Sequence, residues 1–239
     1  MRSRREAHIV PSREEAIQEI MRLASMAAHE VAGPIDQISS LVALFERRYQ
    51  GKLDADADVM LAHIGAARSR LARTAIGLRK CLQASTTGQR YVLVDMNEIL
   101  RTAITSLRKV IADGHAELSA ESLPSLAGDR DLLVLLMETL LDNALTFHEA
   151  GVPPRIEVLA TSGPESHVIQ VRDHGIGMEP QHSEDVFEPF RKLNGRVYPG
   201  AGFGLTLART IVEMHGGKIW IEPADPGTCV LFELPVRTA

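Results

Sequence analysis

The sequence predicts two parts: an antiparallel pair of long helices over residues 1–85 and an α+β sandwich over residues 86–239. Three observations lead to this prediction. Two helical stripes of apolar residues lie before residue 83, a small polar segment occupies residues 84–89, and β-rich runs alternate with helical patterns after it. The composition, 45% hydrophobic and 24% charged, is typical of a folded globular protein.

The first helix is expected to begin at Ser12, which is a suitable N-cap, and to run past Phe45. Its apolar residues recur in steps of three and four, at Ile17, Ile20, Ala24, Ala27, Val31, Ile35, Ile38, Val42 and Phe45. Turn-forming residues follow at 49–56, and a second stripe comprises Met60, Ile64, Ala67, Leu71, Ala75, Leu78 and Leu82. Because one hairpin cannot bury two such narrow stripes, we expect two copies to form a dimeric four-helix bundle.

The helical pattern predicts that His29 points away from the apolar stripe of the first helix. At about 100° per residue it lies about 200° from Ala27, so its imidazole faces solvent and large partners can approach it. Glu30 can accept one ring N–H and leave the other nitrogen as a nucleophile, and Pro34 should bend the helix just beyond. The alternative is an ordinary surface histidine beside an acidic neighbour.

The second part begins with a predicted strand from Tyr91 to Asp95 and a helix from Met96 to about Ala112. A short strand is expected from Ala116 to Ser119. The segment Leu123–Asp129 then leads into a helix from Asp131 to about Phe147. Further β-rich runs lie at residues 155–160, 167–172, 218–222 and 228–234, which predicts an antiparallel or mixed sheet covered by helices.

The helix that begins at Asp131 has two different faces. Its core stripe consists of Leu132, Leu136, Leu140 and Ala144, whereas Thr139, Asn143 and Phe147 share a neighbouring face at spacings of four. Asn143 can offer an oxygen to Mg²⁺, and Phe147 can form an apolar wall beside a base. The alternative is a solvated asparagine.

Asp173 ends a predicted strand in which His167, Ile169 and Val171 share its face, so its carboxylate is expected to be half-buried. Such a carboxylate needs a donor, and the exocyclic amine of adenine supplies one where guanine carries an oxygen. Gly175 and Gly177 allow the backbone to turn closely around a base.

Three glycines precede the helix that continues from Leu205 to His215. Gly200, Gly202 and Gly204 before a helix N-terminus suit a phosphate cradle, and their spacing matches neither the dinucleotide nor the Walker motif. The preceding segment is expected to form a mobile lid, in which Arg191 and Lys192 can reach phosphates. The alternative is a flexible loop.

Five stretches in this order resemble the motifs of sensor histidine kinases of two-component signalling. The resemblance covers about residues 12 to 236, and the ATP portion of these kinases shares its fold with gyrase-type ATPases and Hsp90 chaperones. The matching stretches are His29 to Ile35 (H-box), Asn143-Ala144 (N-box), Asp173 to Gly177 (G1 box), Phe187 to Phe190 (F-box) and Gly200 to Leu205 (G2 box).

The resemblance implies an ATP-dependent autokinase that phosphorylates His29 and passes the phosphoryl group to an aspartate of a response regulator. It implies ATP and Mg²⁺ as cofactors, Asn143 as the metal ligand, Asp173 as the adenine reader and a homodimer. Thr139 departs from the asparagine usual in these kinases. Gly33 stands where they commonly have a threonine or asparagine that orients water for dephosphorylating the regulator, so weak phosphatase activity is expected.

Two rival functions remain. A gyrase-type or chaperone-type ATPase would carry a glutamate four residues before the metal asparagine, where this chain has Thr139. A histidine phosphotransfer or scaffold dimer without ATP activity would not need Asp173, Asn143 and the three glycines.

Charge and cysteine content limit the partners. A net charge of −5 gives no basic footprint for nucleic acid, and the two cysteines, Cys81 and Cys229, lie far apart as expected in a reducing cytoplasm. No apolar run reaches the roughly 18 residues of a membrane helix, so we expect no membrane insertion. The 28 residues before His29 are too few for a sensor domain, so the stimulus is expected to come from a separate sensor or regulatory protein or from a larger chain of which this sequence is a part.

Overall fold

The computed structural model describes residues 91–178, 182–188 and 204–236, together with residues 37–38, 40–45, 47–49, 52, 54, 56–57, 59–61 and 64–65. Most of the predicted second part is therefore described. Six of the candidate site residues lie outside the described residues: His29, Glu30, Arg191, Lys192, Gly200 and Gly202.

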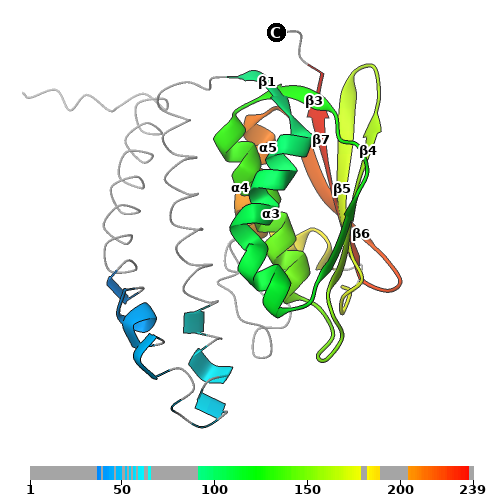
Figure 1. The fold of residues 1–239 in the computed structure, drawn as a ribbon. Coiled ribbons are helices and arrows are strands. Elements are labelled where there is room, and N and C mark those ends of the chain that lie inside the picture. Colours follow the sequence, from blue (N-terminus) through cyan, green and yellow to red (C-terminus); the bar gives the residue numbers. More distant parts are fainter. Residues whose placement is uncertain are drawn as a thin grey trace, which may run out of the picture.

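A five-stranded mixed sheet forms one layer of this part (Figure 1). Its strand order is β2 (Glu117–Ala120), β4 (Arg155–Ser162), β5 (Ser166–Asp173), β7 (Thr228–Pro235) and β6 (Lys218–Pro223). Strands β2 and β4 pair in parallel, and the other neighbours are antiparallel. The predicted antiparallel or mixed sheet is thus confirmed as a mixed one.

Three helices cover one face of this sheet: α3 (Met96–Asp113), α4 (Arg130–Thr146) and α5 (Gly204–Met214) (Figure 1). Asp95 caps α3 by accepting a hydrogen bond from the backbone N–H of Asn97 at 2.8 Å. Asp129 caps α4 in the same way, accepting from the N–H groups of Asp131 and Leu132 at 3.0 and 3.1 Å. Each cap satisfies N–H groups that have no partner within the helix, which fixes where the helix begins.

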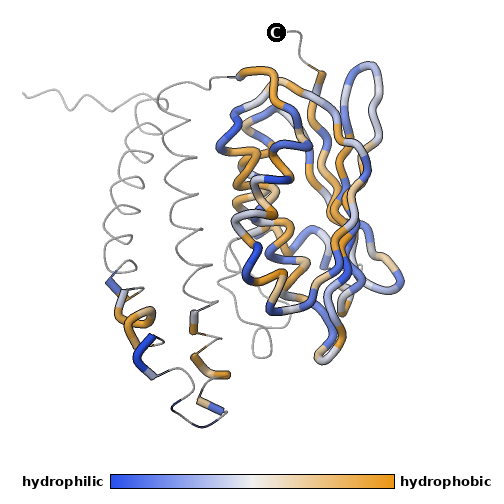
Figure 2. Tube along the Cα trace, viewed as in Figure 1, coloured by the Kyte–Doolittle hydropathy of each residue, from blue (hydrophilic) through white to orange (hydrophobic). Residues whose placement is uncertain are grey.

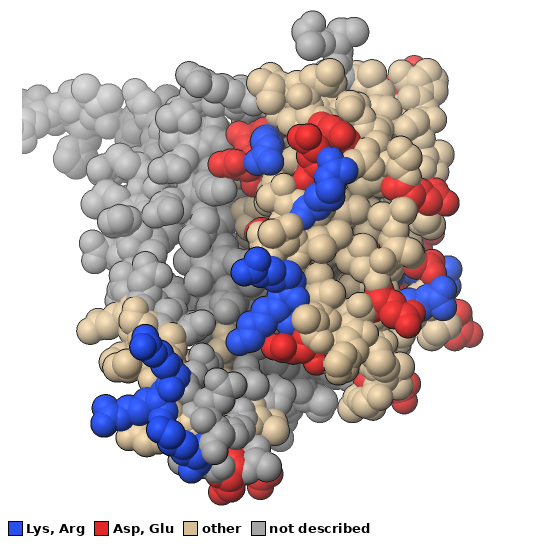
Figure 3. Space-filling view, in the orientation of Figure 1, with Lys and Arg blue, Asp and Glu red and all other residues tan. Residues whose placement is uncertain are grey.

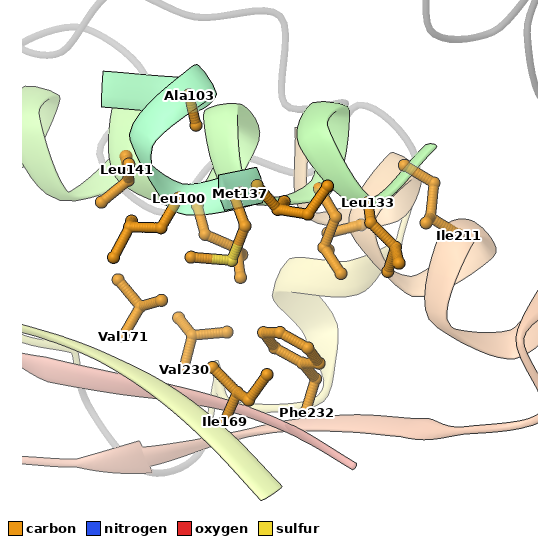
Figure 4. Packing of buried hydrophobic residues seen from close by; sticks show 14 of the residues in the cluster. Leu100, Ala103, Leu133, Met137, Leu141, Ile169, Val171, Ile211, Val230 and Phe232 are labelled. Atoms are coloured by element: carbon orange, nitrogen blue, oxygen red, sulfur yellow. The ribbon is translucent and has the colours of Figure 1, made fainter. Parts of the chain in front are cut away.

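The hydrophobic core lies between the helices and the sheet (Figure 4). Leu100 and Met137 point from the helices toward Val171 and Val230 on the strands, and Phe232 of β7 is fully buried. The alternation expected of a half-buried strand appears in β5, where every second residue from Ile169 is buried. In Figure 2 the hydrophobic segments of the helices and strands accordingly meet in the space between the two layers.

A second, two-stranded sheet pairs β1 (Val92–Asp95) antiparallel with β3 (Ser125–Gly128). The sequence predicted β1 but not β3. Leu93 of β1 is 69% exposed, while Leu126 of β3 packs into the core.

The described residues on both sides of the predicted hairpin turn are helical, namely 37–49 and 56–65 apart from the gaps given above. Asp54 accepts a hydrogen bond from the N–H of Ala57 at 2.8 Å, as an N-cap of the second helix would. The remainder of the predicted hairpin lies outside the described residues, so the four-helix bundle stays a prediction.

On the face shown in Figure 3, positive and negative side chains are interspersed over the described helices and sheet. Cys229 is a buried free thiol, as expected of a small hydrophobic residue, whereas Cys81 lies outside the described residues. Among the helices that the structure describes, none combines the length and the hydropathy needed to cross a membrane.

Candidate active site

Helix α4 presents a partly exposed stripe beside its buried one. Thr139, Asn143 and Phe147 are each partly exposed, whereas Leu136 and Leu140 are buried against the core. The two faces predicted for this helix are therefore confirmed. The hydroxyl of Thr139 donates a hydrogen bond to the carbonyl of Leu135 at 2.7 Å, so this proton is not available to a ligand.

The start of α5 lies directly against this stripe. A Cβ added at Gly204 would be 3.4 Å from Cγ2 of Thr139 and 3.5 Å from Oδ1 of Asn143. Leu205 follows in the first turn of α5 and is partly buried. The N–H groups at the N-terminus of α5, which lack partners within the helix, therefore lie close to the amide oxygen of Asn143.

Asp173 ends β5, and the residue as a whole is 9% exposed. Its Oδ1 accepts hydrogen bonds from the N–H groups of Gly175 at 2.9 Å and Thr228 at 3.3 Å. Burial raises the pKa of Asp173, while these two hydrogen bonds and the nearby charge of His174 act to lower it, and burial prevails. Within the described residues both hydrogen bonds reach Oδ1, which leaves Oδ2 as an acceptor for a ligand.

The loop that follows Asp173 packs on the end of α4. A Cβ at Gly175 would lie 2.0 Å from the carbonyl oxygen of Phe147, and that oxygen accepts a hydrogen bond from the N–H of Ile176 at 3.0 Å. Gly177 has a φ of 68°, which favours glycine. Phe147 and Asp173, 26 residues apart in the chain, are thereby held at the same end of α4.

The turn between β6 and β7 completes the surroundings of Asp173, and the sequence did not predict its part in the site. Gly227 has a φ of 97°, and a Cβ there would lie 1.9 Å from the carbonyl oxygen of Asp173. The N–H of Thr228 then reaches the carboxylate. The Pro-Gly-Thr sequence signalled a turn, but its role depends on the register that pairs Thr228 with Asp173.

Phe187 lies in a short 3₁₀ helix, η2 (Asp185–Phe187), and is buried against α5. The guanidinium carbon of Arg209 on α5 is 4.5 Å from the centroid of the Phe187 ring. This cation–π contact packs the predicted F-box on α5, the helix that begins within the predicted G2 box. No pattern in the sequence predicted the contact of Arg209.

The structure thus gathers eight of the predicted site residues around one side of α4. They are Thr139, Asn143, Phe147, Asp173, Gly175, Gly177, Gly204 and Leu205. Three features follow one another from the C-terminal end of α4 toward its middle. The first is the carboxylate of Asp173, which can accept from an amine, and the second is the amide oxygen of Asn143, which can bind a cation. The third is the N-terminus of α5, which can bind phosphate.

The described residues contain no group of three or more His, Cys, Asp or Glu side chains that could hold a metal ion. Among the described residues, a cation at Asn143 would therefore have few protein ligands. This donor set suits Mg²⁺, which commonly binds one or two protein oxygens and completes its shell with substrate phosphates and water.

Residues 128–238 match the family described as "Histidine kinase-, DNA gyrase B-, and HSP90-like ATPase". The matched segment contains every described residue of the candidate site.

Known proteins also resemble the chain outside this segment. Cyanobacterial phytochrome A of Nostoc sp. (strain PCC 7120) is 30% identical over 232 residues, which cover 96% of this chain and 30% of that protein. The chain therefore spans about a third of the length of this relative.

Two solved structures show the same fold. The mycobacterial sensor histidine kinase MprB superimposes with a TM-score of 0.53 at 28% identity, over 63% of this chain and 100% of that one. The histidine kinase ThkA, solved in complex with the response regulator protein TrrA, gives a TM-score of 0.58 at 20% identity, over 92% of this chain and 64% of that one.

Proposed function

We propose that the chain carries the catalytic core of a sensor histidine kinase and phosphorylates its own His29 with ATP, because its matches to known proteins include an ATPase family shared with these kinases and solved histidine kinases. In this proposal residues 1–85 form a dimerisation and histidine phosphotransfer hairpin, and residues 86–239 form the ATP-binding domain. ATP is a cytoplasmic substrate, so the core would act in the cytoplasm.

The observation that carries the proposal is the contact of two separate segments with one face of α4. The loop after Asp173 packs on Phe147, and Gly204 packs on Asn143. Such a surface would select adenine at one end and phosphate at the other, which is what recognition of ATP requires.

Asp173 would accept a hydrogen bond from the exocyclic amine of adenine at Oδ2, while Phe147 lies beside the base. Asn143 would hold Mg²⁺ through its side-chain oxygen, and the ion would supply positive charge that neutralises the phosphates. Gly204 and Leu205, together with Gly200 and Gly202, would donate backbone N–H groups to the phosphates. Arg191 and Lys192 would add positive charge at the γ-phosphate.

In the transfer step a ring nitrogen of His29 attacks the γ-phosphorus, the bond to the β–γ bridging oxygen breaks, and ADP leaves. Glu30 takes up the ring proton as the phosphohistidine forms. Phosphoryl transfer of this kind depends mainly on positioning and charge neutralisation, which the ATP-binding residues supply.

A homodimer is supported by apolar side chains on the described hairpin helices. Ile38 is 57% exposed and Leu41 is 62% exposed in the single chain, which is unusual for large apolar residues on adjacent turns. A second copy would cover this surface by forming the four-helix bundle. The exposed apolar residues are Ile38, Leu41, Leu44, Phe45, Tyr49, Val59, Met60 and Ile64.

The proposed partner is the receiver domain of a response regulator, whose aspartate would accept the phosphoryl group from His29. The complex of ThkA with TrrA supports this partner class. The test is to phosphorylate the chain with labelled ATP and mix it with a panel of receiver domains. Rapid transfer to one of them is expected, and stable label on this chain with every receiver would contradict the assignment.

The rival ATPase is disfavoured by the site itself. Thr139 stands where such an ATPase would need a glutamate. The hydroxyl of Thr139 donates a hydrogen bond to the carbonyl of Leu135, so Thr139 cannot activate water as a base. A scaffold without ATP activity is disfavoured because Asp173 keeps a buried carboxylate that, without a ligand, destabilises the fold.

A further inference from the structure

Tyr91 contacts the C-terminal end of α5 through a hydrogen bond and a ring contact. Its hydroxyl donates a hydrogen bond to the carbonyl oxygen of Met214 at 2.5 Å, across 123 positions of the chain. Its ring packs on that of His215, with centroids 5.2 Å apart and planes inclined by 53°. The start of the described domain and the last turn of α5 are therefore joined by a polar and an aromatic contact.

His215 extends this junction to α4. The ring is 2% exposed, and its Nε2 lies 3.0 Å from the backbone nitrogen of Asp129. Because a backbone N–H can only donate, Nε2 accepts, and the ring proton is assigned to Nδ1, which donates to the carbonyl of Ile211 at 2.7 Å. The buried histidine is thus neutral and fixed in one tautomer.

Asp129 is the N-cap of α4. The N-terminal end of α4 and the C-terminal end of α5 therefore meet at this junction. At their other ends Gly204 of α5 meets Asn143 of α4. Helix α5 therefore runs about 16 Å as a rigid element between the phosphate end of the site and Tyr91.

We propose that Tyr91 is a positioning residue for phosphoryl transfer, because it fixes where the chain enters the ATP-binding domain relative to α4 and α5. This inference rests on the proposed function, in which His29 lies on the chain N-terminal to Tyr91. The direction in which the chain leaves Tyr91 governs how His29 and the γ-phosphoryl group meet. A misplacement of about 1 Å in such an encounter lowers the rate strongly.

Tyr91→Phe removes the hydrogen bond to Met214 and keeps the ring against His215. The expected result is a rate constant for autophosphorylation at saturating ATP about fivefold lower, the effect of one lost hydrogen bond, with the dissociation constant for Mg·ATP unchanged. Ser166→Ala is the matched control, because Ser166 also donates one hydroxyl hydrogen bond within this domain, to Glu233, away from the junction and the candidate site.

Hydrogen exchange of residues 84–95, measured without nucleotide, tests the anchor independently of kinase activity. Faster exchange is expected in Tyr91→Phe and not in Ser166→Ala. An unchanged autophosphorylation rate in Tyr91→Phe would overturn the inference, and so would an equal loss of ATP affinity. If the wild-type chain takes no label from ATP, the proposed function fails and the positioning role with it, while the exchange data still show whether Tyr91 holds the chain at this point.

Discussion

Gly204 at the start of α5 faces the side chain of Asn143 in α4, with 3.5 Å between the place of a Cβ at Gly204 and Oδ1 of Asn143. The two residues are 61 positions apart in the chain. Their proximity joins the helix N-terminus proposed to hold phosphate to the amide oxygen proposed to hold Mg²⁺. A methyl group at Gly204 fits into this space without a clash, so the space can be filled while the fold is kept.

Gly204→Ala is therefore predicted to fold normally and to lower the affinity for Mg·ATP about tenfold, as for loss of one polar contact. Gly151→Ala is the control for an added methyl elsewhere. Nothing lies within 4 Å of a Cβ at Gly151, but its φ of 83° disfavours alanine, so this variant should lose about 1 kcal/mol of stability and keep its nucleotide affinity. Calorimetric titration and thermal unfolding of both variants check the prediction, and equal nucleotide affinities would contradict it.

Asp173→Asn is predicted to lower ATP affinity about 10- to 100-fold, because an amide N–H₂ would face the amine of adenine where Oδ2 now accepts. Burial raises the pKa of Asp173, so protonation favours the folded state and the ionised carboxylate opposes it at neutral pH. The substitution should therefore leave the thermal stability of the nucleotide-free protein unchanged or higher. Lower stability in this variant would show that the carboxylate is structural.

The pH dependence of ATP binding follows from the same shift. The carboxylate accepts fully only when ionised, so affinity should be present at neutral pH and lost as the pH falls through the raised pKa of Asp173. The decline should begin at a higher pH than it would for an ordinary aspartate. Binding measured from pH 7 downward in the wild type tests this, with Asp173→Asn as the control that lacks this titration.

Thr139 and Asn143 explain which parts of the site the sequence could predict. Both lie on one helix with a regular apolar stripe, so their common face followed from periodicity alone. The sequence did not predict strand β3, because its four residues, preceded by Pro124, show no alternation of polar and apolar types and pair only with β1. The sequence did not predict the role of Thr228, because this role depends on a contact across 55 positions and no local pattern indicates such a contact.

Thr139→Asn is predicted to lower the Mg²⁺ concentration needed for half-maximal ATP binding by roughly tenfold, since a second amide beside Asn143 can orient the ion or its water. Thr146→Asn is the control, because Thr146 makes the same hydroxyl bond to the carbonyl four residues earlier on the same helix. Mg²⁺ titrations of ATP binding in both variants check it. An equal Mg²⁺ requirement in the two variants would show that position 139 does not face the ion.

Gly33→Thr is predicted to accelerate dephosphorylation of the cognate response regulator. Gly33 has no side chain to hold a water near the phosphoaspartate, so the wild-type chain should have weak phosphatase activity. The measurement is the decay of purified phosphorylated regulator with ADP and either form of the protein. Strong acceleration by the wild type would show that another residue orients the water.

The most direct test of the central claim is the site of labelling by Mg·ATP carrying a labelled γ-phosphate. The wild type should acquire phosphate that is lost in acid and stable in alkali, as expected of phosphohistidine. His29→Gln should acquire none while binding ATP with wild-type affinity, because the nucleophile and the nucleotide site lie in different parts of the chain. Acid-labile label that persists in His29→Gln would contradict the account.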